Sequence, residues 1–197
     1  HCDWSASHYL KMIMDEIFKP QHFRNELIWC YKVNKGVFYN KFQPRHDVIL
    51  FYAKSNRNWF YPESIRMSPS EATLRRWGKY AKCGEVPYEK LTPGMKRAAN
   101  YNEKPYKLRG GIQVDWLTIP ALGTGDCKER RGINYPTQKP EELLVRIIKA
   151  SSKEEDWVLD PFCRCRTTAI VASKLNRRFI GIDIDTSNYE KGQLPTA

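Results

Sequence analysis

The final third of the chain carries the pattern that most limits its fold: a short apolar strand, a tight turn, a helix and a second apolar strand. Residues Trp157–Leu159 predict the first buried strand, Thr167–Leu175 the helix and Phe179–Ile184 the second strand. Strands this apolar are typical of a sheet covered on both faces. The turn Asp160–Arg166 leads into a helix N-terminus, which is a ready site for a nucleoside-containing cofactor.

An acidic residue ends the second predicted strand at the spacing that such a site needs. Asp183 follows Asp160 by 23 positions, and an acidic residue about 20 positions after the turn binds ribose hydroxyls in dinucleotide-binding folds. The alternative is an α/β protein whose second strand ends in Asp without any role in binding. The spacing alone leaves both interpretations open.

The first elements of the chain are predicted to be a helix and two strands. Residues 5–18 predict an amphipathic helix, with Ser5 as its N-cap and Pro20 ending it. Residues Leu27–Tyr31 and Val48–Tyr52 predict buried strands, antiparallel and joined by a long polar loop. The apolar stripe of the helix consists of Tyr9, Leu10, Ile13, Met14 and Ile17.

A second amphipathic helix is predicted after residue 139. Pro140, Glu141 and Glu142 suit a first helical turn, because proline lacks a donor and acidic side chains favour the positive end of the helix dipole. The buried stripe of this helix is predicted to consist of Leu143, Leu144, Ile147 and Ile148.

Residues 55–111 interrupt this order. Prolines and glycines punctuate the segment, and its only predicted helix is Ser70–Tyr80. We therefore expect an insertion at 55–111, with residues 1–54 and 112–197 forming the two parts of the main domain.

Positive charge favours a polyanionic partner, and nucleic acid is the commonest. The chain carries a net charge of +11, and residues 55–111 hold twelve Lys or Arg against five Asp or Glu, interleaved with eight aromatic residues. Cations neutralise phosphates and aromatic rings stack on bases. The alternative is a solvated surface whose rings pack inward. On the first interpretation, Arg75, Arg76 and Lys79 of the predicted helix are expected to contact DNA.

Six cysteines are too few for a disulfide scaffold in a chain of 197 residues, and none of their spacings is Cys-x2-Cys. The sequence has neither a secretory signal pattern nor an apolar run near the roughly 20 residues of a membrane span. We expect reduced thiols, no metal site, no membrane contact and a cytoplasmic location.

Four segments together resemble the amino-methylating DNA methyltransferases, which act on adenine N6 or cytosine N4. Asp160–Thr168 is similar to the family's cofactor loop, Asp-Pro-Phe-x-Gly-x-Gly-Thr-Thr, and Tyr135–Pro140 to the segment that precedes it in the β class of motif order. His1–Tyr9 and Phe23–Trp29 are similar to the strand end, helix and strand that follow the family's catalytic tetrapeptide. The resemblance implies a Rossmann-like methyltransferase fold, a mixed and mostly parallel sheet with an antiparallel strand pair.

The resemblance also implies a cofactor and partners. Asp160 would lie near the methionine end of S-adenosylmethionine, Asp183 would bind its ribose, and the segment 55–111 would be the target-recognition region on double-stranded DNA. A cognate restriction endonuclease is an implied partner, and adenine is favoured over cytosine as the target. The side chains implied at the cofactor site are Thr137, Lys139, Asp160, Phe162, Cys163 and Asp183.

Two departures from the family pattern argue against activity. The tetrapeptide Asp/Asn/Ser-Pro-Pro-Tyr, which holds the flipped base in this family, does not occur in the 197 residues. Arg164 and Arg166 stand where the cofactor loop has glycines, and a Cβ in a left-handed conformation costs about 1–2 kcal/mol. We therefore expect no catalytic residue in this chain, impaired cofactor binding and no methyl transfer. An N-terminally truncated fragment, a degenerate pseudoenzyme and sequence errors each explain the departures.

Two other functions remain open from the sequence. The chain could be a non-catalytic nucleic-acid-binding remnant of the family, which keeps the basic insertion alone. It could also bind a nucleotide phosphate, with Arg164 and Arg166 facing the anion at the helix N-terminus.

Overall fold

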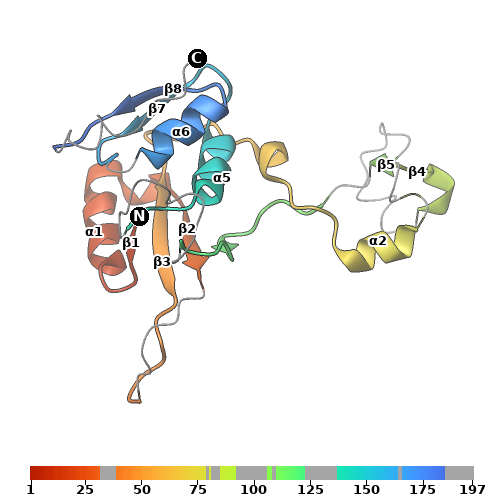
Figure 1. Ribbon diagram of the computed structural model, residues 1–197, viewed down its shortest axis with the longest axis horizontal. Helices are drawn as coiled ribbons and strands as arrows, with labels where there is room; N and C mark the ends of the chain where they lie inside the picture. The colour runs from red at the N-terminus through yellow and green to blue at the C-terminus, as the bar shows by residue number, and fades with distance from the viewer. Residues whose placement is uncertain are drawn as a thin grey trace. The chain divides into compact units, whose positions relative to one another are not determined.

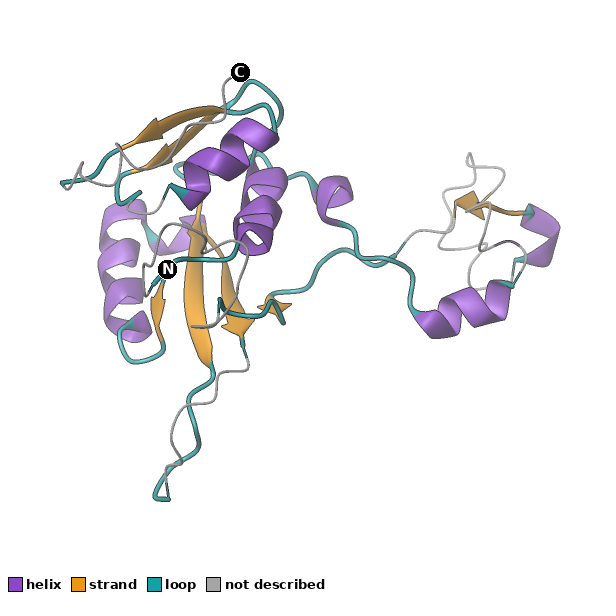
Figure 2. Ribbon diagram, viewed as in Figure 1, coloured by secondary structure: helices purple, strands orange, loops and turns teal. Residues whose placement is uncertain are grey.

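The computed structural model describes residues 1–31, 39–78, 80, 85–91, 106–107, 110–122, 137–163 and 166–184. The chain divides into two compact units, one formed by residues 1–61 and 114–197 and the other by residues 62–113. Both units mix helices and short strands (Figures 1 and 2). The structure is therefore a mixed α/β fold, as predicted.

A four-stranded mixed sheet forms the centre of the larger unit, in the order β1-β3-β2-β6. The strands are β1 (Cys2–Asp3), β2 (Phe23–Cys30), β3 (His46–Tyr52) and β6 (Trp116–Leu117). β3 pairs antiparallel with both β1 and β2, whereas β2 and β6 are parallel. The predicted antiparallel pair is confirmed, and β2 begins four residues before its predicted start.

The core of this unit lies between the mixed sheet and helix α5 (Glu141–Ser151). Trp29, Leu117, Ile119 and Leu143 are each about 2% exposed or less and pack together. The indole Nε1 of Trp29 donates a hydrogen bond of 2.7 Å to the backbone oxygen of Ile119, so the buried ring keeps its polar atom satisfied.

Helix α1 runs from Ser7 to Phe18, and its predicted N-cap is wrong. Ser5 does not cap the helix; instead, Asp3 Oδ1 accepts hydrogen bonds from the backbone N–H groups of Ser5 and Ala6, at 3.0 Å each. The carboxylate of Asp3 therefore satisfies the backbone N–H groups that precede the helix. A 3-10 turn, Pro20–His22, follows the helix.

The face of α1 that meets the sheet also differs from the amphipathic prediction. Asp15 accepts hydrogen bonds from Lys11 (2.6 Å) and from the Tyr52 hydroxyl (2.7 Å) on β3, and the bond from Lys11 is the main cause of the lowered Asp15 pKa. The Lys11 ammonium lies 4.3 Å from the ring centre of Phe23. Because these polar contacts attach the helix to the sheet, much of the predicted stripe is exposed, including Tyr9 (73%), Ile13 (51%) and Ile17 (64%).

The predicted strand–turn–helix–strand unit is present, and its two strands form a parallel sheet. β7 (Trp157–Asp160) pairs with β8 (Arg178–Gly181), and α6 (Thr167–Lys174) connects them. Val171 and Ala172 of α6 are fully buried against Ile148 of α5. The expectation that β7 is buried on both faces is wrong, because Trp157 and Leu159 are 61% and 60% exposed. Val158, between them, faces the helices.

The smaller unit contains α2 (Glu71–Trp77), β4 (Glu85–Val86) and β5 (Tyr106–Lys107), with 3-10 turns at Pro62–Ile65 and Tyr88–Lys90. Ser70 caps α2 by accepting a 3.2 Å hydrogen bond from the Thr73 N–H, and Gly78, with φ +43°, ends the helix. Trp77, Val86 and Leu91 form a small buried cluster. None of the helices in the described ranges is long and apolar enough to cross a membrane.

Candidate functional site

The turn after β7 is held together by the carboxylate of Asp160. Its Oδ1 accepts a hydrogen bond of 3.0 Å from the Phe162 N–H, and its Oδ2 accepts one of 2.6 Å from the Thr168 hydroxyl. Asp160 therefore connects the end of β7 to both the following turn and the first turn of α6. Of the residues predicted at the cofactor site, Asp160 thus has a visible positioning role.

The same turn is bonded to the segment that follows β8. The Ile182 N–H donates to the Asp160 oxygen (2.9 Å), and the Cys163 N–H donates to the Ile182 oxygen (3.1 Å). Asp183 comes next in the chain, so the structure brings Asp160, Cys163 and Asp183 to one end of the parallel sheet.

Gly181 permits the close approach between this turn and β8. A Cβ at Gly181 would lie 2.5 Å from Cys163 Sγ and 2.6 Å from the ring of Phe179. Real Cβ atoms do not approach neighbours so closely. Cys163, which is 4% exposed, therefore fits only because position 181 has no side chain.

Arg166 has the left-handed backbone predicted for a glycine of the cofactor loop, with φ 57° and ψ 10°. Its N–H donates to the Cys163 oxygen (2.8 Å), and its own oxygen accepts the first hydrogen bond of α6, from Ile170 (3.0 Å). The residue is only 6% exposed. Arg164, the other predicted glycine position, lies outside the described residues.

Carboxylates and open apolar surface occur together at this end of β7 and β8. Phe162 is 85% exposed and Ile184 is 96% exposed. Carboxylate oxygens suit ribose hydroxyls or an ammonium group, and apolar side chains suit a purine ring. These acceptor and apolar groups fit an adenosine-containing ligand, and the backbone at Arg166 already has the conformation that a glycine loop would adopt.

Of the other two predicted cofactor residues, Lys139 lies near the mixed sheet. Lys139 Nζ lies 5.8 Å from the ring centre of Trp29 and donates a hydrogen bond of 3.2 Å to the Thr137 oxygen. Lys139 therefore lies near Trp29 of β2 and bonds to Thr137, whereas the Asp160 turn is bonded to the segment after β8.

The sequence analysis missed a polar cluster at the end of β2. Asp47 Oδ1 accepts a 2.8 Å hydrogen bond from the Tyr31 hydroxyl, and His1 Nε2 lies 2.9 Å from Asp47 Oδ2. Burial and the bond to Asp47 raise the pKa of Tyr31 to about 12. The register that pairs Trp29 with Asp47 brings these residues together, and only the exact strand pairing could have revealed it.

Two of the three residues predicted to contact DNA lie in the last turn of α2. The Arg75 side chain is 80% exposed and lies 3.9 Å from Glu71, and Arg76 lies 5.7 Å from the ring centre of Trp77. The negative end of the helix dipole also stabilises cations in the last turn, which is a structural reason for these arginines apart from DNA. Lys79 lies outside the described residues.

Sequence comparisons relate nearly the whole chain to DNA methylases. The family described as DNA methylase (N6_N4_Mtase) matches residues 1–193. The DNA adenine methyltransferase YhdJ of Escherichia coli (strain K12) is 54% identical over 171 residues, which are 86% of this chain and 50% of that protein. The type II methyltransferase M2.DpnII of Streptococcus pneumoniae is 63% identical over 51 residues, 26% of this chain and 19% of its own. The chain thus spans half or less of the length of these relatives.

Solved structures agree on the fold. The PvuII DNA methyltransferase, specific for cytosine N4, matches with a TM-score of 0.57 at 11% identity, over 92% of this chain and 53% of its own. The complex of M1.HpyAVI with SAM matches with a TM-score of 0.52 at 18% identity, over 96% of this chain and 69% of its own. These likenesses confirm the predicted fold class.

Proposed function

The chain belongs to the DNA methylase family, and from that premise we propose that it is the cofactor-holding and DNA-contacting part of a site-specific DNA methyltransferase. The hydrogen bond from Ile182 to Asp160 carries this proposal, because it sets Asp160 and Asp183 at neighbouring ends of β7 and β8. Asp160 ends β7, whereas β8 ends at Gly181, so Asp183 lies two residues beyond the strand that was predicted to end near it. Two carboxylates at this edge of adjacent parallel strands suit an adenosine-containing cofactor.

S-adenosylmethionine, when bound, would supply an electrophilic methyl group. Asp183 would accept hydrogen bonds from the ribose hydroxyls, and Phe162 and Cys163 would line the adenosine. Asp160 would place negative charge near the methionine end while it holds the turn through Phe162 and Thr168. Thr137 and Lys139 would close the opposite side, with Lys139 near the Trp29 ring of β2 and bonded to the Thr137 oxygen.

We propose the exocyclic amine of adenine as the target, in double-stranded DNA. The relative that covers most of the chain is named a DNA adenine methyltransferase, which supports this choice over cytosine. The unit 62–113 would carry the recognition surface, and Arg75 and Arg76 would contact DNA phosphates. The type II relative supports a restriction endonuclease as a cognate partner.

Two observations favour a second function, a DNA-binding remnant without methyl transfer. Arg166 holds a strained backbone where the family has glycine. The tetrapeptide that binds the flipped base does not occur among the 197 residues. The remnant would keep the basic unit and lose the cofactor.

Calorimetric titration with S-adenosylmethionine, beside duplex DNA binding at several salt concentrations, separates these functions. Cofactor binding together with DNA binding supports the methyltransferase part, even if binding is weak. DNA binding alone supports the remnant, and binding of inorganic phosphate alone would support the nucleotide-phosphate alternative. A chain that binds neither DNA nor cofactor would refute both proposals.

A further inference from the structure

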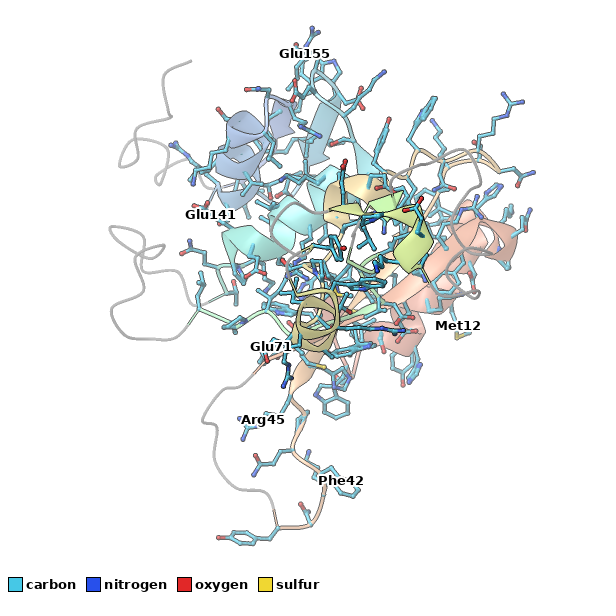
Figure 3. The ribbon with its side chains drawn as sticks, turned by 90° about the vertical axis from the view of Figure 1, so that its right-hand side faces the viewer. Met12, Phe42, Arg45, Glu71, Glu141 and Glu155 are labelled. Carbon is cyan, nitrogen blue, oxygen red and sulfur yellow. The ribbon has the colours of Figure 1, made fainter. Side chains whose placement is uncertain are left out.

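The connection between β2 and β3 presents two aromatic rings to solvent. Phe42 is 100% exposed and Tyr39 is 96% exposed. Figure 3 shows the Phe42 side chain on a segment that extends beyond the strands, with Arg45 nearer to them. Exposed rings of this size gain free energy when a partner covers them. Neither ring is used by the proposed cofactor site.

The charge of the connecting sequence identifies the chemistry of that partner. Residues 32–45 contain four basic residues and no acidic residue. Two of the four, Lys41 and Arg45, lie in the described part of the connection and flank Phe42. Cations next to exposed rings are the combination that binds nucleic acid, because phosphates pair with the cations while bases stack on the rings.

The base of the segment is anchored to the sheet. The Tyr31 N–H donates a 3.0 Å hydrogen bond to the Arg45 oxygen, which closes the connection next to the last pair of the strand ladder, Cys30 and His46. The Arg45 guanidinium donates to Gln43 Oε1, and Lys41 Nζ lies 5.7 Å from the ring centre of Trp4. The rings therefore project from a base that the strands hold in place.

We propose that the segment Tyr39–Arg45 enters the DNA that this protein binds, with Phe42 inserted between neighbouring base pairs. Tyr39 stacks on an unstacked base, and Lys41 and Arg45 contact the flanking phosphates. Apolar wedges of this kind unstack a base step and kink the duplex. Unstacking lowers the cost of turning a base out of the helix, which a base-modifying enzyme requires. This inference rests on the proposed function, because it assumes that the partner is DNA.

The test compares Phe42→Ala with Tyr9→Ala, which removes another exposed aromatic ring, from α1. Binding of the whole chain to a fluorescent duplex is measured by anisotropy at several salt concentrations, and bending by energy transfer between dyes at the duplex ends. Phe42→Ala should weaken binding about fivefold or more, leave the salt slope unchanged and remove the bend. Lys41→Ala should reduce the salt slope by about 0.9, and Tyr9→Ala should change nothing.

Because Phe42 is fully exposed, its replacement leaves the fold intact, and circular dichroism of the variant checks this. If the parent chain binds and bends DNA but Phe42→Ala behaves identically, the wedge is wrong and the proposed function stands. If the parent binds no DNA, both are overturned. Binding to anionic lipid vesicles that Phe42→Ala abolishes, while DNA binding stays unchanged, would reassign the segment to a membrane surface and overturn the inference.

Discussion

Replacing Arg166 with glycine should strengthen S-adenosylmethionine binding. Arg166 holds φ 57° at the start of α6, and a side chain in that region costs about 1–2 kcal/mol. This strain raises the energy of the loop conformation that would bind the cofactor, so alternative loop conformations are favoured by that amount. Relief of about 1 kcal/mol raises the apparent affinity by up to about fivefold; this is the upper limit, because Arg166 already holds the binding conformation in the structure.

Glu155 provides the matched control. It also has a left-handed backbone, with φ 66°, but it precedes β7, whereas Arg166 follows it. Glu155→Gly relieves the same kind of strain and should raise the unfolding free energy by up to about 1 kcal/mol, after the entropy cost of glycine, without changing cofactor affinity. Calorimetric titration and urea unfolding of both variants give the two quantities.

The reasoning fails if Arg166→Gly binds S-adenosylmethionine no better than the parent chain. It also fails if Glu155→Gly improves binding equally, because the effect would then be global stability and not the loop. A third variant, Arg166→Asn, keeps a Cβ but tolerates the left-handed region. It should bind between the parent and the glycine variant.

Three further predictions concern DNA, catalysis and pH. Replacing Arg75 and Arg76 together with alanine should weaken duplex binding and flatten its salt dependence, by about 0.9 in slope for each lost phosphate contact; an unchanged slope would show that neither side chain touches the backbone. The chain alone should transfer no methyl groups to DNA, and incorporation of labelled methyl above a no-protein control would contradict this. Because the pKa of Tyr31 is raised to about 12 in the fold, its contribution to stability is complete below pH 10 and is lost as pH rises toward 12. Tyr31→Phe should remove that part of the alkaline loss, as measured by unfolding at pH 9 and pH 11.5.

Periodicity predicted the positions of several elements well, although the predicted burial of β7 was wrong. The strand pair, α5 and the strand–helix–strand unit at 157–181 all occur close to their predicted positions. The start of α2 also agrees, because Ser70 is a local capping signal, but the helix ends at Gly78 and not at the predicted Tyr80. At these places the local sequence was sufficient to predict where the element lies.

Periodicity failed where tertiary contacts override it. On α1 the contacts of Lys11 and Asp15 with Tyr52 and Phe23 attach the helix to the sheet, and the stripe that periodicity assigned to the core is largely exposed. Pairing of polar groups across the sheet cannot be read from one segment alone. The same limit hid the Tyr31–Asp47 contact, which depends on the strand register.

The candidate site divides in the same way. The left-handed backbone of Arg166 was predictable, because the family's motif has glycine at this position and glycine in a tight turn indicates a positive φ. The double role of Asp160, which bonds both Phe162 and Thr168, was not predictable from residue types. The role proposed for Phe42 was also missed. The signal in the sequence was the connection 32–45, which has four basic residues and no acidic residue.

The most direct measurement of the central claim is the S-adenosylmethionine affinity of the double variant Arg164→Gly, Arg166→Gly, with and without Asp183→Asn. Asp183→Asn removes the carboxylate proposed to bind the ribose, and Glu154→Gln makes the same chemical change on an exposed residue before β7. We predict that the glycine variant binds the cofactor more tightly than the parent, that Asp183→Asn abolishes this gain, and that Glu154→Gln leaves it unchanged. Equal binding with and without the Asp183 carboxylate would contradict a cofactor site at the ends of β7 and β8.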